Sequence, residues 1–102
     1  MCSNDFHNEL YGYVQHHLES QKGDGKFAKE EEVDSYLVSK GLKRDWDWAR
    51  TSTQKYKTTL PVFVRNSIHH PENNLNGEVT ERELRDSTKA LVSIVESINR
   101  SS

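Results

Sequence analysis

Apolar residues recur at intervals of three and four along most of this chain, which is the pattern of amphipathic helices. The first predicted helix covers Asn4 to Ser20, where Phe6, Leu10, Tyr13, Val14 and His17 fall at helical spacing. Gln21 to Lys26 contains two glycines and no apolar residue, which predicts a turn or loop. A second helix is expected from Lys29 to Lys40, because three glutamates near its start suit the helix dipole and Gly41 follows as a C-cap.

The same spacing continues through the middle of the chain. Trp46, Ala49, Thr53, Tyr56 and Leu60 follow steps of three and four, which predicts a helix from about Asp45 to Lys57 although threonines weaken helix propensity there. In that helix Trp46 would lie on the buried side, and Trp48 would be the more exposed tryptophan. Thr58 or Thr59 can cap a further helix that runs until Pro71 stops it.

The last helix has the clearest beginning. Thr80 and Glu83 have the spacing of a capping box, directly after the turn-forming residues 73–77. An apolar stripe then continues through Leu84, Thr88, Leu91, Val95 and Ile98, with Ile94 beside it. Because no segment shows the alternation of a strand, we expect an all-α fold, a small bundle of four to five helices formed by residues 1–102 as a single domain.

Composition narrows the function classes. The formal charge of −2 argues against a protein that coats nucleic acid through bulk positive charge. Cys2 is the only cysteine, so no internal disulfide or cysteine-based zinc site can form, and no apolar run is long enough to span a membrane. Only 32% of the residues are hydrophobic, which predicts a thin core that gains from burial against a second copy or a partner. We therefore expect a cytoplasmic protein that forms a homodimer or a complex.

Candidate chemistry concentrates in the segment from Leu60 to Asn74. At about 100° per residue, Arg65 lies one turn below His69 and Asn66 one turn below His70, so these four side chains would form one polar patch near a helix end. Metal-free RNA cleavage needs groups that move protons and a cation that holds the phosphate. His70 or His69 suits the first role and Arg65 the second.

The same residues also have a purely structural interpretation. Arg65 could pair with Glu72 or cap the helix, while the histidines bond to the following loop. Glu72 and Asn73 come directly after Pro71 and could fold back over the helix end. With Asn66 they are the candidate substrate-binding residues, whereas Arg65, His69 and His70 are the candidate catalytic ones. Residue spacing alone leaves both interpretations open.

The string Arg65-Asn66-Ser67-Ile68-His69-His70 resembles the signature of HEPN-type helical ribonucleases, in which an arginine and a polar residue precede a histidine. The resemblance implies a HEPN-like helical domain in which two protomers bring their motifs together and cleave RNA without a metal. Arg65 would then bind the phosphate, Asn66 would be its polar neighbour, and His70 would be the catalytic histidine. Toxin members often have a tyrosine two positions after the histidine, where this chain has Glu72.

A longer string, Leu60 to Asn74 followed by Thr80 to Leu84, resembles the C-terminal tail of AAA (SMC/ABC-like) ATPases of phage defence and abortive infection. This chain has no glycine-rich phosphate loop, so ATPase activity is not expected. The two resemblances imply an antiphage-defence or toxin–antitoxin protein that cleaves or binds RNA through Arg65 and His70 in a composite dimer site. The alternative is a non-catalytic interaction module that docks on a defence ATPase or another partner.

Two other candidate sites are weaker. The pairs His16-His17 and His69-His70 suggest zinc, but adjacent helical residues point about 100° apart and cannot easily ligate one ion. We therefore expect neither a metal nor a cofactor. A basic stretch that includes Arg44 and Lys57 could follow RNA, although interleaved aspartates make a solvated surface the simpler interpretation.

Overall fold

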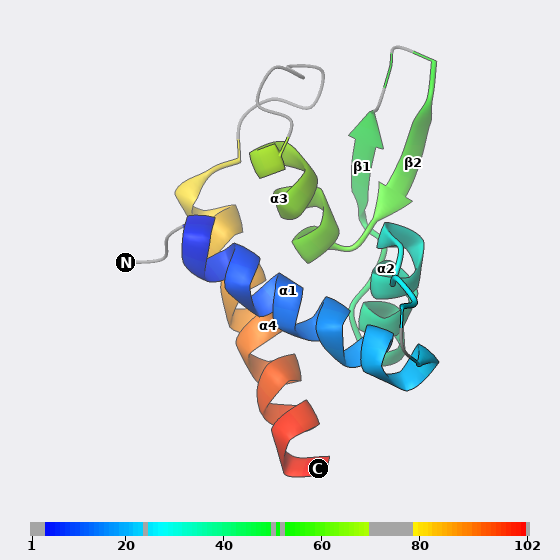
Figure 1. Cartoon of the computed structure of the whole chain (residues 1–102). Helices are drawn as coiled ribbons and strands as arrows, with labels where there is room; N and C mark the ends of the chain where they lie inside the picture. Colours follow the sequence, from blue (N-terminus) through cyan, green and yellow to red (C-terminus); the bar gives the residue numbers. More distant parts are fainter. Residues whose placement is uncertain (1–3, 24, 50, 52, 70–78, 102) are drawn as a thin grey trace.

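The computed structural model describes residues 4–23, 25–49, 51, 53–69 and 79–101, and these residues are mostly helical. In chain order the elements are α1 (Asn4–Lys22), α2 (Glu30–Ser39), β1 (Trp46–Ala49), β2 (Lys55–Thr58), α3 (Leu60–His69) and α4 (Glu81–Ser101) (Figure 1). The four described helices fit the expected helical bundle. The class is not purely all-α, however, because a two-stranded sheet joins α2 to α3.

The sequence predicted the end of α2 to within one residue and the capping box at the start of α4, whereas α1 continues to Lys22, two residues beyond its predicted end. α2 ends just before Gly41, whose φ of 103° is left-handed, and the Leu42 N–H donates to the Leu37 carbonyl across this turn. At the start of α4, the Thr80 N–H donates to Glu83 Oε1 at 2.9 Å and the Glu83 N–H donates to Thr80 Oγ1 at 3.1 Å. The capping box is confirmed, because each side chain satisfies a backbone donor that the first turn leaves open.

The helix predicted from Asp45 to Lys57 is wrong, because this segment forms an antiparallel hairpin of β1 and β2. Alternate residues of a strand share a face, so Trp46 and Trp48 both reach Phe63 of α3, with ring centroids 5.4 and 5.9 Å away. On the opposite face of β1, Asp47 pairs with Lys57 at 3.1 Å. Aromatic and β-branched residues favour this pleated arrangement.

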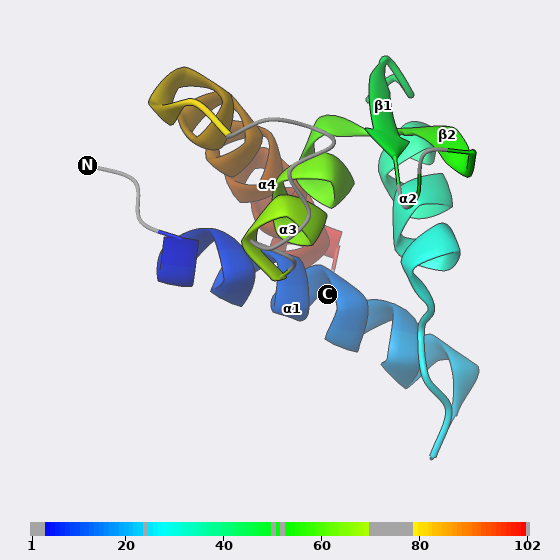
Figure 2. The ribbon, with the colours of Figure 1, turned by 90° about the horizontal axis from the view of Figure 1, so that it is seen from above.

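The core lies between the helices rather than under the hairpin. Its fully or nearly fully buried members come from all four helices and include Tyr11, Val14, Val33, Leu37, Val62, Leu91, Ile94 and Ile98. α1 and α4 cross each other, and α3 packs against both (Figures 1 and 2). The hairpin lies beside α3 and α2, where the two tryptophans cover Phe63. This arrangement brings the beginning of α2 close to β2 and to α3.

Candidate functional site

Three of the predicted site residues lie on α3 and three lie outside the described part of the chain. Arg65, Asn66 and His69 are described, and His69 is the exposed last residue of the helix. His70, Glu72 and Asn73 fall within residues 70–78, which are not described. The predicted meeting of Arg65 with His70 therefore stays a prediction.

Arg65 packs against α1. Its guanidinium carbon lies 4.6 Å from the centre of the Tyr11 ring, and the arginine is half-buried. This is a cation–π contact, which fixes the guanidinium while leaving the N–H groups at its edge able to donate. Arg65 forms no ion pair with any other described residue.

A buried histidine lies close to this arginine. His7 of α1 is 0% exposed, and its Nε2 lies 2.6 Å from the Ser87 hydroxyl oxygen of α4. Burial, and then the positive charge of Arg65, lower the pKa of His7 to about 4, while the neighbouring Asn8 side chain opposes the shift. His7 is therefore neutral near pH 7. It joins α1 to α4 and was not among the residues selected from the sequence.

The phenol of Tyr11 responds to the same surroundings. Burial raises its pKa far above the ordinary range, the charge of Glu30 adds to this effect, and Arg65 opposes it. Both a carboxylate and a guanidinium thus act on Tyr11 from α2 and α3. The region around Arg65, the predicted phosphate-binding residue, therefore contains a negative as well as a positive charge, because Glu30 also acts on it.

Asn66 points to a different neighbour from Arg65. Its amide Nδ2 donates to Glu30 Oε1 of α2 at 2.5 Å, and the asparagine is only 9% exposed. The same carboxylate oxygen accepts a hydrogen bond from the Tyr56 hydroxyl of β2 at 3.4 Å. Adjacent helical positions diverge by about 100°, so Arg65 reaches α1 while Asn66 reaches α2. Arg65 and Asn66 of the predicted polar patch therefore contact two different helices.

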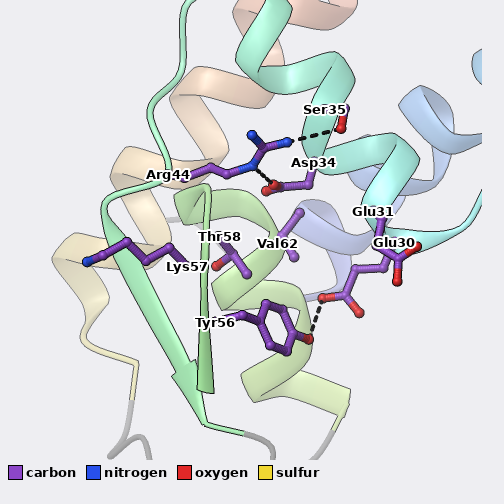
Figure 3. Close-up of a pocket in the computed structure, with 9 residues that line it drawn as sticks. All are labelled: Glu30, Glu31, Asp34, Ser35, Arg44, Tyr56, Lys57, Thr58 and Val62. Carbon is purple, nitrogen blue, oxygen red and sulfur yellow. Dashed lines mark hydrogen bonds and ion pairs between the residues drawn. The ribbon is translucent and has the colours of Figure 1, made fainter. Parts of the chain in front are cut away.

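Beyond Glu30 there is a cavity of about 340 Å³, lined by residues of α2, β2 and α3 and by the segment between α2 and β1 (Figure 3). Its lining residues are Glu30, Glu31, Asp34, Ser35, Arg44, Tyr56, Lys57, Thr58 and Val62. The hydrogen bonds of Glu30 link this cavity to Asn66, and thus to the segment that the sequence singled out.

Asp34 holds one end of the cavity together. This buried carboxylate accepts hydrogen bonds from the Thr59 N–H at 2.8 Å and the Thr59 hydroxyl at 2.9 Å, both through Oδ1. Its other oxygen, Oδ2, pairs with Arg44 Nε at 2.5 Å, and Arg44 also donates to the Ser35 hydroxyl at 3.0 Å. Asp34 thereby connects α2 to the residue that precedes α3 and to the segment before the hairpin.

Sequence reasoning did not find this cavity. Glu30 and Glu31 were interpreted only as residues that suit a helix start, which they also are. Tyr56 was assigned to a helix, so its position on a strand opposite α2 could not be foreseen. Arg44 and Lys57, considered as a path for RNA, are each paired with an aspartate.

Other kinds of site have little support within the described residues. In that part of the chain no three histidine, cysteine, aspartate or glutamate side chains are grouped so that they could hold a metal ion. Nor does any described helix combine the length and apolar character needed to cross a membrane. Comparison of the chain with protein-family models, curated proteins and solved structures gives no significant match.

Proposed function

We propose that this protein is a non-catalytic interaction module that docks on a protein partner through the face formed by α2, the hairpin and α3. The observation that carries the proposal is the hydrogen bond from Asn66 to Glu30. Asn66 is buried within the fold and holds a carboxylate beside the cavity.

Charge supports this choice over RNA cleavage. A phosphate that approached Asn66 would meet the Glu30 carboxylate at hydrogen-bonding distance from the same amide. Like charges at such short range oppose binding, and here the two share a partly buried environment that weakens screening by salt. The formal net charge of −2 adds no compensating attraction for a polyanion. The resemblance to tails of phage-defence ATPases makes such an ATPase the first partner to test.

Metal-independent cleavage or binding of RNA in a composite dimer site is the second candidate, and one observation favours it. The Arg65 guanidinium is held on the Tyr11 ring without an ion-pair partner among the described residues, so its N–H groups could bind a phosphate. In a HEPN-like dimer, His70 would supply proton transfer beside it. This function needs Arg65 and His70 to converge on one accessible spot.

A cleavage assay with the full chain separates the two functions. Labelled RNA is incubated with the parent protein, Arg65→Lys and Arg65→Ala in a buffer with EDTA, and products are resolved on a gel. Arg82→Ala, which removes an exposed arginine of α4, is the matched control. Circular dichroism confirms that each variant is folded. The interaction module predicts no cleavage that depends on Arg65, and cleavage lost in both Arg65 variants but kept in Arg82→Ala would overturn it.

The partner side is tested by mixing the purified chain with purified phage-defence ATPases from the same genome. We expect one of them to form a complex of fixed stoichiometry in size-exclusion chromatography with light scattering. The complex should persist after treatment with ribonuclease, because RNA does not bridge the two proteins. A chain that binds none of these ATPases, but dimerises and cleaves RNA, refutes the module.

A further inference from the structure

The cavity beside Glu30 contains charges of both signs, but most of them are already paired. Asp34 and Arg44 neutralise each other at one end. Lys57 pairs with Asp47 and points away from the other lining side chains (Figure 3). Among the described lining residues this leaves the carboxylates of Glu30 and Glu31 without an opposite charge. The charge that the cavity presents to an incoming group is therefore negative.

The two remaining carboxylates differ in how they are held. Glu30 is half-buried and fixed through Oε1 by the Asn66 amide and the Tyr56 hydroxyl. Glu31 is exposed, and no described residue forms a hydrogen bond or ion pair with it. The cavity thus has one carboxylate positioned in advance, which lowers the ordering cost of binding, and one that can adjust to a ligand.

The exposed part of the remaining lining can receive a planar cation. Val62 and Thr58 are almost completely buried and close the inner side of the cavity, and Tyr56 lies beside Glu30 (Figure 3). The Tyr56 side chain points toward Glu30, and the residue is 39% exposed. An aromatic ring next to carboxylates is a favourable environment for guanidinium, which stacks on rings and forms paired hydrogen bonds with carboxylates.

We propose that this cavity binds an arginine side chain of the protein partner. This inference rests on the proposed interaction module and names the chemistry of its contact. The guanidinium would bind Glu31 and the open edge of Glu30 and stack on Tyr56. A volume of about 340 Å³ is close to the lower end of ligand cavities, roughly 300 Å³, and so suits one side chain rather than a folded segment.

The test uses N-acetyl-arginine amide as the probe and N-acetyl-citrulline amide, which has nearly the same shape but no charge, as its control. Each compound is titrated into the ¹⁵N-labelled full chain and followed by amide chemical shifts. The arginine compound should give saturable shifts at residues that line the cavity, and the citrulline compound should give none at equal concentration. N-acetyl-lysine amide should bind more weakly than arginine, because ammonium lacks the planar fork.

Variants assign the effect to individual side chains. Glu31→Gln should weaken arginine binding about threefold or more, in the range of a partly exposed ion pair, whereas Glu81→Gln at the start of α4 should leave it unchanged. Tyr56→Phe keeps the ring and should bind within about twofold of the parent, while Tyr56→Leu should bind more weakly. These changes lie on exposed positions, so folding of each variant can be verified by its amide spectrum.

Four results would overturn the inference. Three are equal shifts with arginine and citrulline, saturable shifts confined to residues away from the cavity, and arginine binding that is unchanged in Glu31→Gln. The fourth is tighter binding of inorganic phosphate than of the arginine compound at this site. None of these results affects the size-exclusion test with an ATPase, so the interaction module can survive loss of the arginine site. Conversely, RNA cleavage that depends on Arg65 would refute the module without changing the arginine titration.

Discussion

The buried His7 predicts that the protein loses stability in mild acid. Its pKa is lowered from 6.5 in the unfolded chain to about 4 in the fold, first by burial and then by Arg65. Between these two values the unfolded chain binds more protons, so the free energy of unfolding falls as the pH falls. From pH 8 to pH 5 the protonation of His7 should lower the free energy of unfolding by about 2 kcal/mol. Below pH 4 the total loss from this group should reach about 3 kcal/mol.

The contacts of His7 explain the direction of this effect. In the neutral ring one nitrogen carries a proton and the other can accept, whereas protonation makes both nitrogens donors. Nε2 lies 2.6 Å from the Ser87 hydroxyl, but the buried Nδ1 has no hydrogen-bond partner among the described residues. The new charge would also be fully buried near the Arg65 guanidinium. Both effects penalise the protonated ring in the folded state only, because in the unfolded chain the imidazole is hydrated.

The assay is urea denaturation followed by circular dichroism at pH 8, 7, 6 and 5. His7→Gln removes the titrating group. Over this pH range the free energy of unfolding of the variant should therefore fall by about 2 kcal/mol less than that of the parent. His16→Gln on the same helix is the control, and because the His16 side chain is 88% exposed the parent pH dependence should remain. Identical pH dependence in the parent and His7→Gln would refute the reasoning.

A direct measurement covers the case in which His7→Gln does not fold. The ring resonances of His7 in the parent protein should titrate with a midpoint near pH 4 in the folded state. Arg65→Met should move that midpoint upward, because it removes the second cause of the shift. A midpoint at the ordinary value of 6.5 would contradict the burial argument, and an unchanged midpoint in Arg65→Met would contradict the role of the guanidinium.

Three further predictions concern stability. Trp48→Ala should cost about 3 kcal/mol or more in urea denaturation, because the residue is 3% exposed and its ring packs edge-on against α3, and a loss below 1 kcal/mol would contradict that packing. Thr80→Ala should cost about 1 kcal/mol by removing the capping box, whereas Ser93→Ala, an exposed change inside the same helix, should cost nothing. Asp34→Ala should cost about 2 kcal/mol, since it leaves two buried Thr59 donors without their acceptor, and a neutral result would contradict this.

The helix ends were predictable because their signals are local. Thr80 and Glu83 satisfy donors within a single turn, and Gly41 adopts a backbone conformation that other residues rarely take. No distant contact is needed to explain either. For the same reason the predicted boundaries of α2 differ from the observed ones by only one residue.

The hairpin was missed because its residues fit two periods. Trp46, Ala49 and Tyr56 fit a helical spacing, whereas Trp46 and Trp48 lie two apart and fit a strand. What decides between them is Phe63, which contacts both tryptophans from another element. The secondary structure of such a short segment is determined by its tertiary contacts rather than by the intrinsic propensity of its residues. The error also reversed the predicted burial, since Trp48 is the more buried tryptophan.

The candidate site was predictable only in part. The chemistry of Arg65 and Asn66 indicated a candidate site, but the sequence could not give their orientations. Arg65 is oriented by Tyr11 of α1, and Asn66 by Glu30 of α2. Nothing in the local sequence around Asn66 indicates a glutamate 36 positions earlier as its partner. The cavity is lined in part by β2, so it could not be predicted from a sequence interpretation that assigned this strand to a helix.

The first and last helices are joined across nearly the full length of the chain. His7 meets Ser87, and the Tyr13 hydroxyl donates to the Asn99 side chain, so these contacts span 80 and 86 residues. Bringing such distant segments together requires closure of a long loop, which slows folding. During synthesis, α1 must leave the ribosome long before its partner helix exists. Until then Tyr11 and Val14 remain uncovered, and in that interval the nascent chain is most vulnerable to aggregation and proteolysis.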